Sequence, residues 1–346
     1  MPVSRTLTWT SRCAGPMIAN PGSSSSPGTA LIGGIARIAI VTCPAGGVNF
    51  TPGWVPRKKP ILWSEPRPEF VPAQWAYEDA KAGLDAAGRL IDVSLAERRN
   101  LVMRNPTPNA VFETSRTLVC AYQMILPGEH APSHRHSSHA LRVIIDAKGS
   151  YSTVNGEKTP METGDVVLTP GWCWHGHGHD GDQPAYWFDG LDVPLTHLLE
   201  PMFYQEHPQK YEKVERVVQT SPFRFTRGDI ARRLDAVQAD AEGFHGSRVT
   251  LAAPDMPPMG LTMERLASGT KTRRYRTTAN TIFHVTEGTG ETTIGEKHLV
   301  WQRGDTFVAP GWHSISHRAT ADAELFVLSD EPLLRFSNYY RFEAMD

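Results

Sequence analysis

Short apolar runs with strand-like alternation recur along the chain, and glycine or proline bounds them. The clearest are residues 117–126, 141–145 and 164–169, and the second of these leads to Gly149. Short apolar runs between turn residues predict strands rather than helices. The pattern therefore predicts an all-β core.

Helical patterns are few and lie outside these runs. Residues 77–87 carry apolar side chains at helical spacing and precede Gly88, which predicts a helix with a glycine C-cap. Residues 94–97 form a capping box that opens a short helix. Residues 226–229 resemble a second cap, and the apolar stripe after them is expected to pack. We therefore expect a few peripheral helices.

The pattern of the first half returns in weakened form in the second half. Residues 304–312 repeat residues 164–172 at an offset of 140 residues, and residues 269–290 echo residues 128–149. Self-similarity at a nearly fixed offset indicates an internal duplication. Together with the alternation, it predicts two tandem β-barrels.

Histidines are concentrated in residues 128–179, which hold seven of the fourteen in the chain. His134 and His136 belong to one predicted strand, and His175 and His177 to another. Because side chains alternate along a strand, the members of each pair share a face. If the strands are neighbours in a small barrel, three imidazoles converge on one point, as Fe(II), Zn or Ni requires. Any one histidine alone is better read as a packed or surface group, but the combined spacing favours a metal site.

The second copy lacks these ligands. Tyr275 and Thr277 stand at the positions of the His-x-His pair, and Ile315 at that of the third histidine. The remaining histidines of this half do not recreate the spacing, and we expect them to be surface or packing groups. They are His284, His298, His313 and His317. We therefore expect the second barrel to hold no equivalent metal.

Two polar residues lie within predicted apolar strands. Spacing alone does not decide whether Gln123 faces outward or inward. An inward side chain would need a partner such as a substrate hydroxyl or a metal-bound water. A buried Arg142 costs free energy unless it pairs with an anion, so a substrate carboxylate is its expected partner. Trp172 and Trp174 either wall a pocket or pack within the barrel.

Composition adds limits on size, charge and compartment. At 346 residues the chain has room for two domains of ordinary size. Its 35 basic and 37 acidic residues leave a net charge of -2, which argues against nucleic-acid or membrane partners. Four scattered cysteines do not form a disulfide framework, which fits a reducing cytoplasm.

Changes in composition divide the chain into segments. Low-complexity glycine and serine runs near the N-terminus predict disorder, and the apolar run there is too short to span a bilayer. The expected division is a disordered N-terminal extension at 1–56, an extended arm and helices at 57–100, a metal-binding first barrel at 101–194, a helical linker at 195–245 and a degenerate second barrel at 246–346.

The two histidine clusters resemble the two motifs of the cupin superfamily. Matches to the first motif are Gly128, His134, His136 and Gly149, and matches to the second are Gly164, Pro170 and His175. The glutamate of the first motif is missing, since Ala140 and Leu141 stand at its position. Trp172 and His179 replace the later glycine and the asparagine of the second motif.

These departures point to one family. Loss of the acidic ligand together with Pro-Gly-Trp-Cys-Trp-His-Gly-His-Gly at residues 170–178 resembles the gentisate 1,2-dioxygenase family, which also includes dioxygenases of salicylate, 5-nitrosalicylate and 1-hydroxy-2-naphthoate. The likeness runs from about Trp75 to the C-terminus and includes residues 96–99, 126–129 and 187–194. The resemblance implies a bicupin, with two tandem jelly-roll β-barrels.

The resemblance implies a chemistry as well as a fold. One Fe(II) per chain is expected in the first barrel, held by His134, His136 and His175. A small aromatic acid and O2 would be the substrates. Both oxygen atoms would enter an ortho-hydroxybenzoate between its carboxyl-bearing and hydroxyl-bearing carbons, with gentisate or a 5-substituted salicylate such as 5-nitrosalicylate as the acid. Family members are typically homotetramers, and they act in the breakdown of aromatic compounds.

Four further residues receive roles from the resemblance. Arg98 and Arg142 are expected to pair with the substrate carboxylate, and an inward Gln123 to orient the substrate. His177, on the face of the third ligand, is expected to hydrogen-bond the phenolate or the oxygen intermediate and to shuttle a proton. Arg142 and His177 are thus the expected catalytic residues.

Two other functional classes stay open. A non-catalytic cupin for ligand sensing or storage would use the same barrels, although it would not need three histidines beside two inward arginines. A different bicupin enzyme, such as an oxalate-decarboxylating one, is disfavoured because its metal site needs the missing glutamate. Sequence alone also leaves the metal open, since three imidazoles accept Zn, Ni or Mn.

Overall fold

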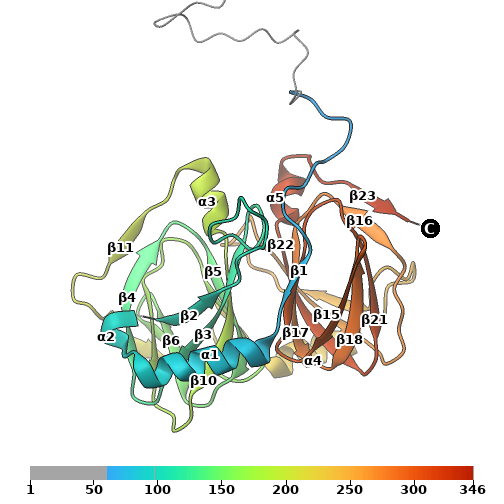
Figure 1. Cartoon of the computed structure of the whole chain (residues 1–346). Coiled ribbons are helices and arrows are strands. Elements are labelled where there is room, and N and C mark those ends of the chain that lie inside the picture. The colour runs from blue at the N-terminus through green and yellow to red at the C-terminus, as the bar shows by residue number, and fades with distance from the viewer. Residues whose placement is uncertain (1–60, 97, 346) are drawn as a thin grey trace, which may run out of the picture. The chain divides into compact units, whose positions relative to one another are not determined.

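Strands dominate the chain, as the alternating pattern predicts. The computed structural model describes residues 61–96 and 98–345. Within them the strands form four sheets, which pair into two barrels (Figure 1). The predicted all-β core of two tandem jelly-roll barrels with a few peripheral helices is confirmed. The expected extension at residues 1–56, and Glu97 of the expected capping box, lie outside the described residues.

The first barrel is built of two six-stranded sheets. Their strand orders are β13-β8-β5-β10-β3-β2 and β11-β4-β9-β6-β7-β12. The strands are β2 (Arg99–Val102), β3 (Val119–Ile125), β4 (His130–His136), β5 (Ala140–Asp146), β6 (Ser150–Val154), β7 (Glu157–Met161), β8 (Val166–Thr169), β9 (His175–His179), β10 (Ala185–Leu191), β11 (Tyr204–Glu206), β12 (Arg216–Val217) and β13 (Arg224–Phe225). Between β6 and β7, Asn155 and Gly156 take positive φ values of 46° and 78°, as a tight two-residue hairpin requires.

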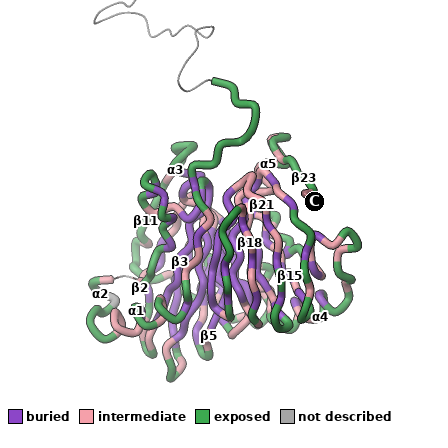
Figure 2. The backbone as a smooth tube through the Cα atoms, turned by 45° about the vertical axis from the view of Figure 1, so that its right-hand side comes forward, coloured by how far each residue is buried: buried purple, intermediate pink, exposed green. Residues whose placement is uncertain are grey.

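The second barrel repeats this arrangement. Its sheets have the orders β1-β20-β17-β22-β15-β14 and β19-β18-β21-β16-β23. The strands are β1 (Ala73–Trp75), β14 (Ser247–Thr250), β15 (Gly260–Leu266), β16 (Tyr275–Thr277), β17 (Thr281–Glu287), β18 (Thr289–Ile294), β19 (Lys297–Gln302), β20 (Thr306–Ala309), β21 (Ser314–Ala319), β22 (Ala323–Ser329) and β23 (Phe342–Ala344). β1 precedes the first barrel in sequence yet pairs with β20, so the N-terminal arm supplies an edge strand to the second barrel. Buried residues follow the strands of both barrels (Figure 2).

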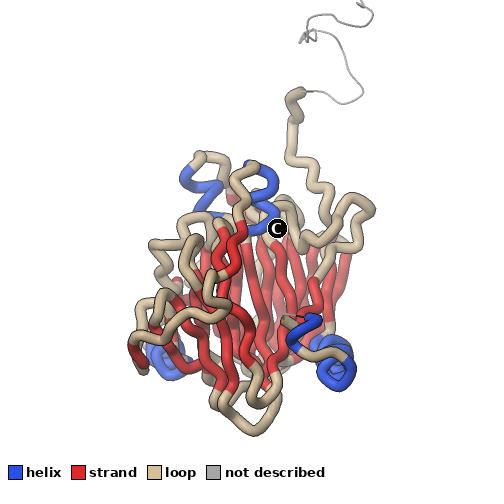
Figure 3. Tube along the Cα trace, turned by 90° about the vertical axis from the view of Figure 1, so that its left-hand side faces the viewer, coloured by secondary structure: helices blue, strands red, loops and turns tan. Residues whose placement is uncertain are grey.

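The helices lie at the periphery of the strands (Figure 3). They are α1 (Tyr77–Leu90), α2 (Val93–Ala96), α3 (Val193–Leu199), α4 (Arg227–Asp235) and α5 (Glu331–Phe336). α1 continues through Gly88, where the pattern predicted its end, because the helix packs on β3: a Cβ at Gly88 would lie 2.9 Å from the terminal methyl of Met124. α4 begins as predicted, since the Asp229 N–H donates to Thr226 Oγ1 at 3.1 Å. No helix among the described residues has the length and apolar content needed to cross a membrane.

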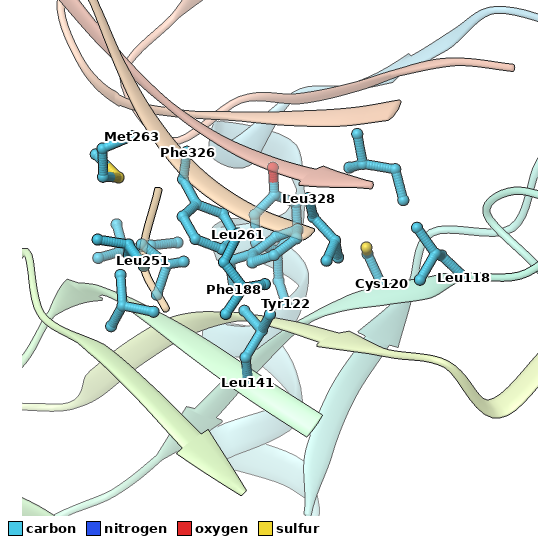
Figure 4. Packing of buried hydrophobic residues seen from close by; sticks show 14 of the residues in the cluster. Leu118, Cys120, Tyr122, Leu141, Phe188, Leu251, Leu261, Met263, Phe326 and Leu328 are labelled. Atoms are coloured by element: carbon cyan, nitrogen blue, oxygen red, sulfur yellow. The ribbon is translucent and has the colours of Figure 1, made fainter. Parts of the chain in front are cut away.

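An apolar layer joins the two barrels. Leucine, methionine and aromatic side chains meet there (Figure 4), with Cys120, Tyr122, Leu141 and Phe188 from the first barrel and Leu261, Met263, Phe326 and Leu328 from the second. The Tyr122 hydroxyl donates across the layer to the Gly304 carbonyl oxygen at 2.7 Å. Each fully buried side chain of this kind contributes about 1.5–3 kcal/mol. The layer therefore holds the barrels side by side.

The two barrel interiors differ in polarity. Tyr275, Phe283 and Trp301 belong to a continuous aromatic and aliphatic core in the second barrel. The corresponding cluster in the first barrel is smaller and includes Ile144 and Trp187. Buried histidine, arginine, aspartate and glutamine side chains lie beside it. Glu264 and His317 are buried in the second barrel as well, but the cluster of buried histidines lies in the first.

The segment expected as a helical linker, residues 195–245, also contributes strands. β11 pairs with β4, β12 with β7 and β13 with β8, so both sheets of the first barrel are extended by residues that follow it. These strands are two or three residues long. Such short pairings carry no readable alternation, which is why the sequence pattern does not show them.

Candidate metal centre

Three histidines meet inside the first barrel, where β4 and β9 are neighbours. His134 stands opposite His175 in the pairing of these strands. One nitrogen from each of His134, His136 and His175 lies within 4.8 Å of the other two. The ring centroids of His134 and His175 are 4.5 Å apart, and those of His136 and His175 are 4.9 Å apart. The structure thus brings together the three predicted ligands in a group able to hold one metal ion.

Backbone carbonyls fix the tautomers of two of these rings. His136 Nδ1 lies 2.8 Å from the Ser138 carbonyl oxygen, and His175 Nδ1 lies 3.0 Å from the Cys173 carbonyl oxygen. A carbonyl only accepts, so each Nδ1 carries the proton and each Nε2 keeps its lone pair. His175 Nε2 is buried and has no hydrogen-bond partner within the described chain. This arrangement is typical of metal-ligating imidazoles, whose second nitrogen donates to the protein.

Burial keeps the His136 and His175 imidazoles neutral. Desolvation, with a further contribution from His134, lowers the pKa of His136 to about 4. Desolvation and then the charge of Arg142 lower the pKa of His175 well below its ordinary value. The neutral ring is the form that binds a metal ion, so the environment favours binding.

A Pro-Gly-Trp turn delivers the third histidine to β9. Trp172 has a φ of 66°, and its N–H donates to the His136 carbonyl oxygen at 2.7 Å. A Cβ on Gly171 would lie 2.4 Å from the Ser137 carbonyl oxygen, so the close approach requires glycine. Trp312 in the second barrel has a φ of 67°. The same turn thus shapes both barrels, which explains why the repeat keeps it where the ligands are lost.

Asn155 supports the residue before the third ligand. The Asn155 N–H donates to the Trp174 carbonyl oxygen at 2.9 Å, and the Trp174 N–H donates to Asn155 Oδ1 at 2.9 Å. Trp174 directly precedes His175. The β6–β7 hairpin therefore sets the backbone from which this ligand projects. No role for Asn155 was expected from the sequence, although its Asn-Gly pair between two strands is a hairpin signal.

Asp189 is the anion beside Arg142 and the partner of Gln123. Arg142 Nε lies 3.5 Å from Asp189 Oδ1, and Gln123 Nε2 donates to Asp189 Oδ2 at 2.5 Å. Arg142 Nη1 also donates to Thr169 Oγ1 at 2.5 Å. All four side chains are buried. The partner expected from the sequence for both Arg142 and Gln123 was the substrate, and Asp189 was not foreseen. The signal was an acidic residue inside the apolar run Trp-Phe-Asp-Gly.

Burial raises the pKa of Asp189, and the neighbouring Arg142 charge opposes the shift. Two effects on this carboxyl therefore oppose each other. Desolvation favours its neutral form, and the ion pair with Arg142 favours its charged form. Desolvation also lowers the pKa of Arg142, opposed by Asp189. We take the pair as ionised, because each partner stabilises the charge of the other.

Arg98, Gln123 and His177 line one small cavity, together with Trp187. The His177 ring centroid lies 6.2 Å from that of His175. Neither ring nitrogen of His177 has a hydrogen-bond partner within the described residues, and the ring is buried. Burial, followed by the charge of Arg142, lowers the pKa of His177. Gln123 thus points inward, as the family resemblance favoured.

Arg98 and its neighbour Arg99 have different surroundings. Arg98 Nη1 lies 2.8 Å from His134 Nδ1, so this guanidinium reaches the histidine group. Arg99 is buried, and both terminal nitrogens donate to Glu129, at 2.6 and 2.7 Å. Arg99 is therefore not a solvated surface residue. Its bidentate ion pair ties β2 to the loop before β4.

The second barrel places other side chains at the ligand positions. Tyr275 stands opposite Ile315 in the pairing of β16 and β21, as His134 stands opposite His175 in the first barrel. Both are buried in the core that contains Phe283. Aromatic and aliphatic packing thus occupies the space that the imidazoles take in the first copy.

The fold and the site together define a class of protein. It is a bicupin whose first barrel contains a three-histidine group able to hold a metal ion. The cupin domain family matches residues 121–193, which include all three histidines.

Relatives of known activity narrow this class. The chain is 34% identical over 309 residues to gentisate 1,2 dioxygenase 1 of Aquipseudomonas alcaligenes, covering 81% of this chain and 89% of that protein. It is 32% identical over 327 residues to 5-aminosalicylate 1,2-dioxygenase of Comamonas sp, covering 86% and 87%. A mutant salicylate 1,2-dioxygenase from Pseudoaminobacter salicylatoxidans, solved in complex with gentisate, matches with a TM-score of 0.77 and 26% identity over 82% of this chain and 88% of that chain.

The chain belongs to the gentisate and salicylate 1,2-dioxygenase family. It is therefore an oxidoreductase of the type that incorporates two oxygen atoms into one donor.

Proposed function

We propose that the protein is an Fe(II)-dependent dioxygenase that cleaves the ring of an ortho-hydroxybenzoate between the carboxyl-bearing and hydroxyl-bearing carbons. Gentisate or a 5-substituted salicylate such as 5-nitrosalicylate is the proposed substrate. Relatives named for gentisate, 5-aminosalicylate and 5-nitrosalicylate support this range.

One observation carries the proposal. Buried polar atoms without a hydrogen-bond partner in the described chain gather beside the three imidazoles: both ring nitrogens of His177, Oε1 of Gln123 and Nε1 of Trp187. Buried polar atoms in native proteins are almost always satisfied. Their grouping here supports the binding of a polar molecule next to the metal position.

The donor set fits iron. We propose that His134, His136 and His175 hold one Fe(II) per chain, and the Nε2 lone pairs of the last two are already directed away from their carbonyl partners. Three imidazole ligands would leave room on such an ion for a chelating substrate and for O2. When bound, the iron supplies the redox coupling between an electron-rich ring and O2.

Two arginines are proposed to bind the substrate carboxylate. Arg142 is buried, and its separation of 3.5 Å from Asp189 is longer than a hydrogen bond, so its charge remains available to a second anion. Arg98 reaches the histidine group from another side. A guanidinium has five donors, so each can bind a carboxylate while keeping contacts with the protein. Gln123, held by Asp189, is proposed to orient the ring.

His177 is proposed to hold and move the proton of the 2-hydroxyl group. Neither of its ring nitrogens has a hydrogen-bond partner among the residues that the structure describes, and the ring lies near His175. A neutral imidazole accepts a proton at one nitrogen while donating at the other. Trp187, whose ring centroid is 5.6 Å from that of His177, limits access of water on one side.

We further propose a homotetramer in the cytoplasm. Exposed apolar residues on two helices, Leu198 and Leu199 on α3 and Phe336 on α5, support an assembly that covers them. The free thiols of Cys120 and Cys173 fit a reducing compartment. Light scattering of the purified protein tests the assembly, and a mass other than four chains would contradict it.

Oxygen consumption tests the reaction. Protein purified without oxygen and reconstituted with Fe(II) would be offered gentisate, salicylate, 5-nitrosalicylate and 1-hydroxy-2-naphthoate in parallel. We expect uptake of one O2 for each molecule of at least one acid consumed. Absence of uptake with all four, despite one iron per chain, would contradict the proposal.

Removal of one ligand separates an enzyme from a binding module. We expect His136→Ala to lose both the bound iron and oxygen uptake, because two imidazoles remain. His130→Ala, an exposed histidine on the same strand, is the matched control and should keep both. A variant that loses iron but not turnover would show that the three-histidine group is not the reaction centre.

A further inference from the structure

A strap of chain, residues 200–212, follows α3 and lies along the metal-binding strand. Glu200 turns the chain with a φ of 74°. β11 then lies beside β4 (Figure 1). In this pairing Tyr204 stands opposite His136. Residues that face each other across antiparallel strands project from the same side of the sheet. Tyr204 therefore shares the face of His134 and His136.

Hydrogen bonds tie the strap to β4 on both sides of Tyr204. Before it, the Ser137 N–H donates to the Phe203 carbonyl oxygen at 3.1 Å, and the Phe203 N–H donates to Ser137 Oγ at 3.0 Å. After it, the Ser133 N–H donates to the Lys210 carbonyl oxygen at 2.8 Å. The backbone therefore fixes where the Tyr204 side chain starts.

The Tyr204 side chain lies against a proposed metal ligand. Its ring centroid is 5.0 Å from that of His134, and its hydroxyl is 3.4 Å from His134 Nδ1. Arg98 Nη1 approaches the same nitrogen at 2.8 Å. The Tyr204 hydroxyl oxygen and Arg98 Nη1 therefore lie at most about 6 Å apart, which is the sum of their distances to His134 Nδ1. Tyr204 is 51% exposed, so it borders an opening of the site rather than its packed interior.

We propose that the Tyr204 hydroxyl is a further donor to the substrate carboxylate, beside the two arginines and next to Arg98. This inference rests on the proposed function and names a further residue that selects acids. A carboxylate accepts a hydrogen bond of about 2.8 Å at each oxygen, which lets it bridge donors at this separation. A positive charge and a hydroxyl together suit an anion better than a neutral group. Sequence analysis placed Tyr204 in a linker.

Tyr204→Phe tests the proposal because it keeps the ring and removes the hydroxyl. In the full chain loaded with Zn²⁺, which three imidazoles also accept, calorimetry should show about tenfold weaker binding of gentisate than in the wild type. Catechol, which chelates through two hydroxyls and has no carboxylate, should bind both proteins equally. With Fe(II), the variant should raise KM about tenfold and change kcat less than about twofold.

Tyr211→Phe is the matched control, since Tyr211 lies on the same strap with its ring near Lys210. It should bind gentisate like the wild type. Unchanged gentisate affinity in Tyr204→Phe would overturn the proposal, and so would an equal loss for gentisate and catechol. A wild-type protein that binds gentisate but consumes no O2 would instead contradict ring cleavage. The two failures are therefore distinguishable.

Discussion

Asp189 contacts two of the residues that the sequence assigns to the substrate. Its carboxylate accepts from Gln123 and faces Arg142 inside the barrel. Because strands β3, β5 and β10 are adjacent, these three side chains come from three different strands. We infer that Asp189 positions both residues, and that the negative charge it supplies keeps Arg142 tolerable in the interior.

Replacing Asp189 with Asn removes the charge and nearly preserves the shape. Arg142 is then buried without its anion, which costs about 3–5 kcal/mol. We expect Asp189→Asn to lower the free energy of unfolding in urea by about this amount and to abolish oxygen uptake. Asp182→Asn, at an exposed position before the same strand, should change neither. Unaltered stability in Asp189→Asn would mean that a group other than Asp189 compensates the buried charge of Arg142.

Spacing alone selects the three histidines that the fold brings together, because two close histidines on one strand and a third near a glycine turn define a pattern along the chain. It does not identify Asp189. An acidic residue in an apolar strand shows that a partner is needed, but the register of β10 against β5 decides that the partner is Arg142. Arg99 was missed for the same reason, since its partner Glu129 lies on a different element.

Among the elements, the β6–β7 hairpin has the most direct effect on the metal centre. Asn155 exchanges two hydrogen bonds with Trp174, directly before the ligand His175. Its φ of 46° is one that asparagine and glycine accept more readily than other residues. Asn155 therefore has two roles, because it adopts the turn conformation of the hairpin and it positions the backbone before His175.

Two substitutions separate these roles. Asn155→Gly keeps the turn and removes the side-chain acceptor, whereas Asn155→Ala also strains the backbone by about 1–2 kcal/mol. We expect both to weaken Zn²⁺ binding about tenfold, as loss of outer-shell support typically does. Only Asn155→Ala should show the additional loss of thermal stability. Chelator competition measures the affinity for Zn²⁺. Wild-type affinity in Asn155→Gly would show that the Asn155 side chain does not position the histidine group.

The elements differ in how far the sequence reveals them. Alternating runs bounded by glycine predict β3, β5 and β8, and the cap at Thr226 predicts α4, because these signals are local. The strap contains a three-residue strand whose position depends on hydrogen bonds to β4. No local pattern predicts it, so Tyr204 could be found only in the folded chain.

At the scale of the whole molecule, duplication has produced two barrels with different interiors. Where the first barrel pairs Arg142 with Asp189, the second pairs Phe283 with Val327. The repeat in the sequence predicts both the second barrel and its changed ligand positions. It does not predict the apolar layer between the barrels, since that depends on which sheet faces which.

Buried neutral histidines make the stability of the whole molecule depend on pH. Burial lowers the pKa of His284 and of His317 to about 3. Below about pH 6.5 the unfolded chain binds protons at these positions and the folded chain does not, so stability falls as the pH falls from 6.5 towards 3. Each contributes a loss of about 2 kcal/mol at pH 5 relative to pH 7.

Replacing His317 tests how much of this loss of stability between pH 7 and pH 5 comes from one histidine. His317→Gln removes one titrating ring and keeps a polar group near Thr292, the present partner of His317 Nδ1. We expect the difference in unfolding free energy between pH 7 and pH 5, measured in urea without metal, to shrink by about 2 kcal/mol in this variant. Equal stability of the wild type at the two pH values would contradict the account.

In the proposed reaction both atoms of O2 enter the ring-opened product. The most direct test is turnover of the best substrate under ¹⁸O₂, with immediate reduction of the product to prevent exchange of its ketone oxygen with water, followed by mass spectrometry. We predict two labelled oxygen atoms in the product, one on each side of the cleaved bond. A product with one label or none, or an intact ring, would contradict the assignment of this site to ring-cleaving dioxygenation.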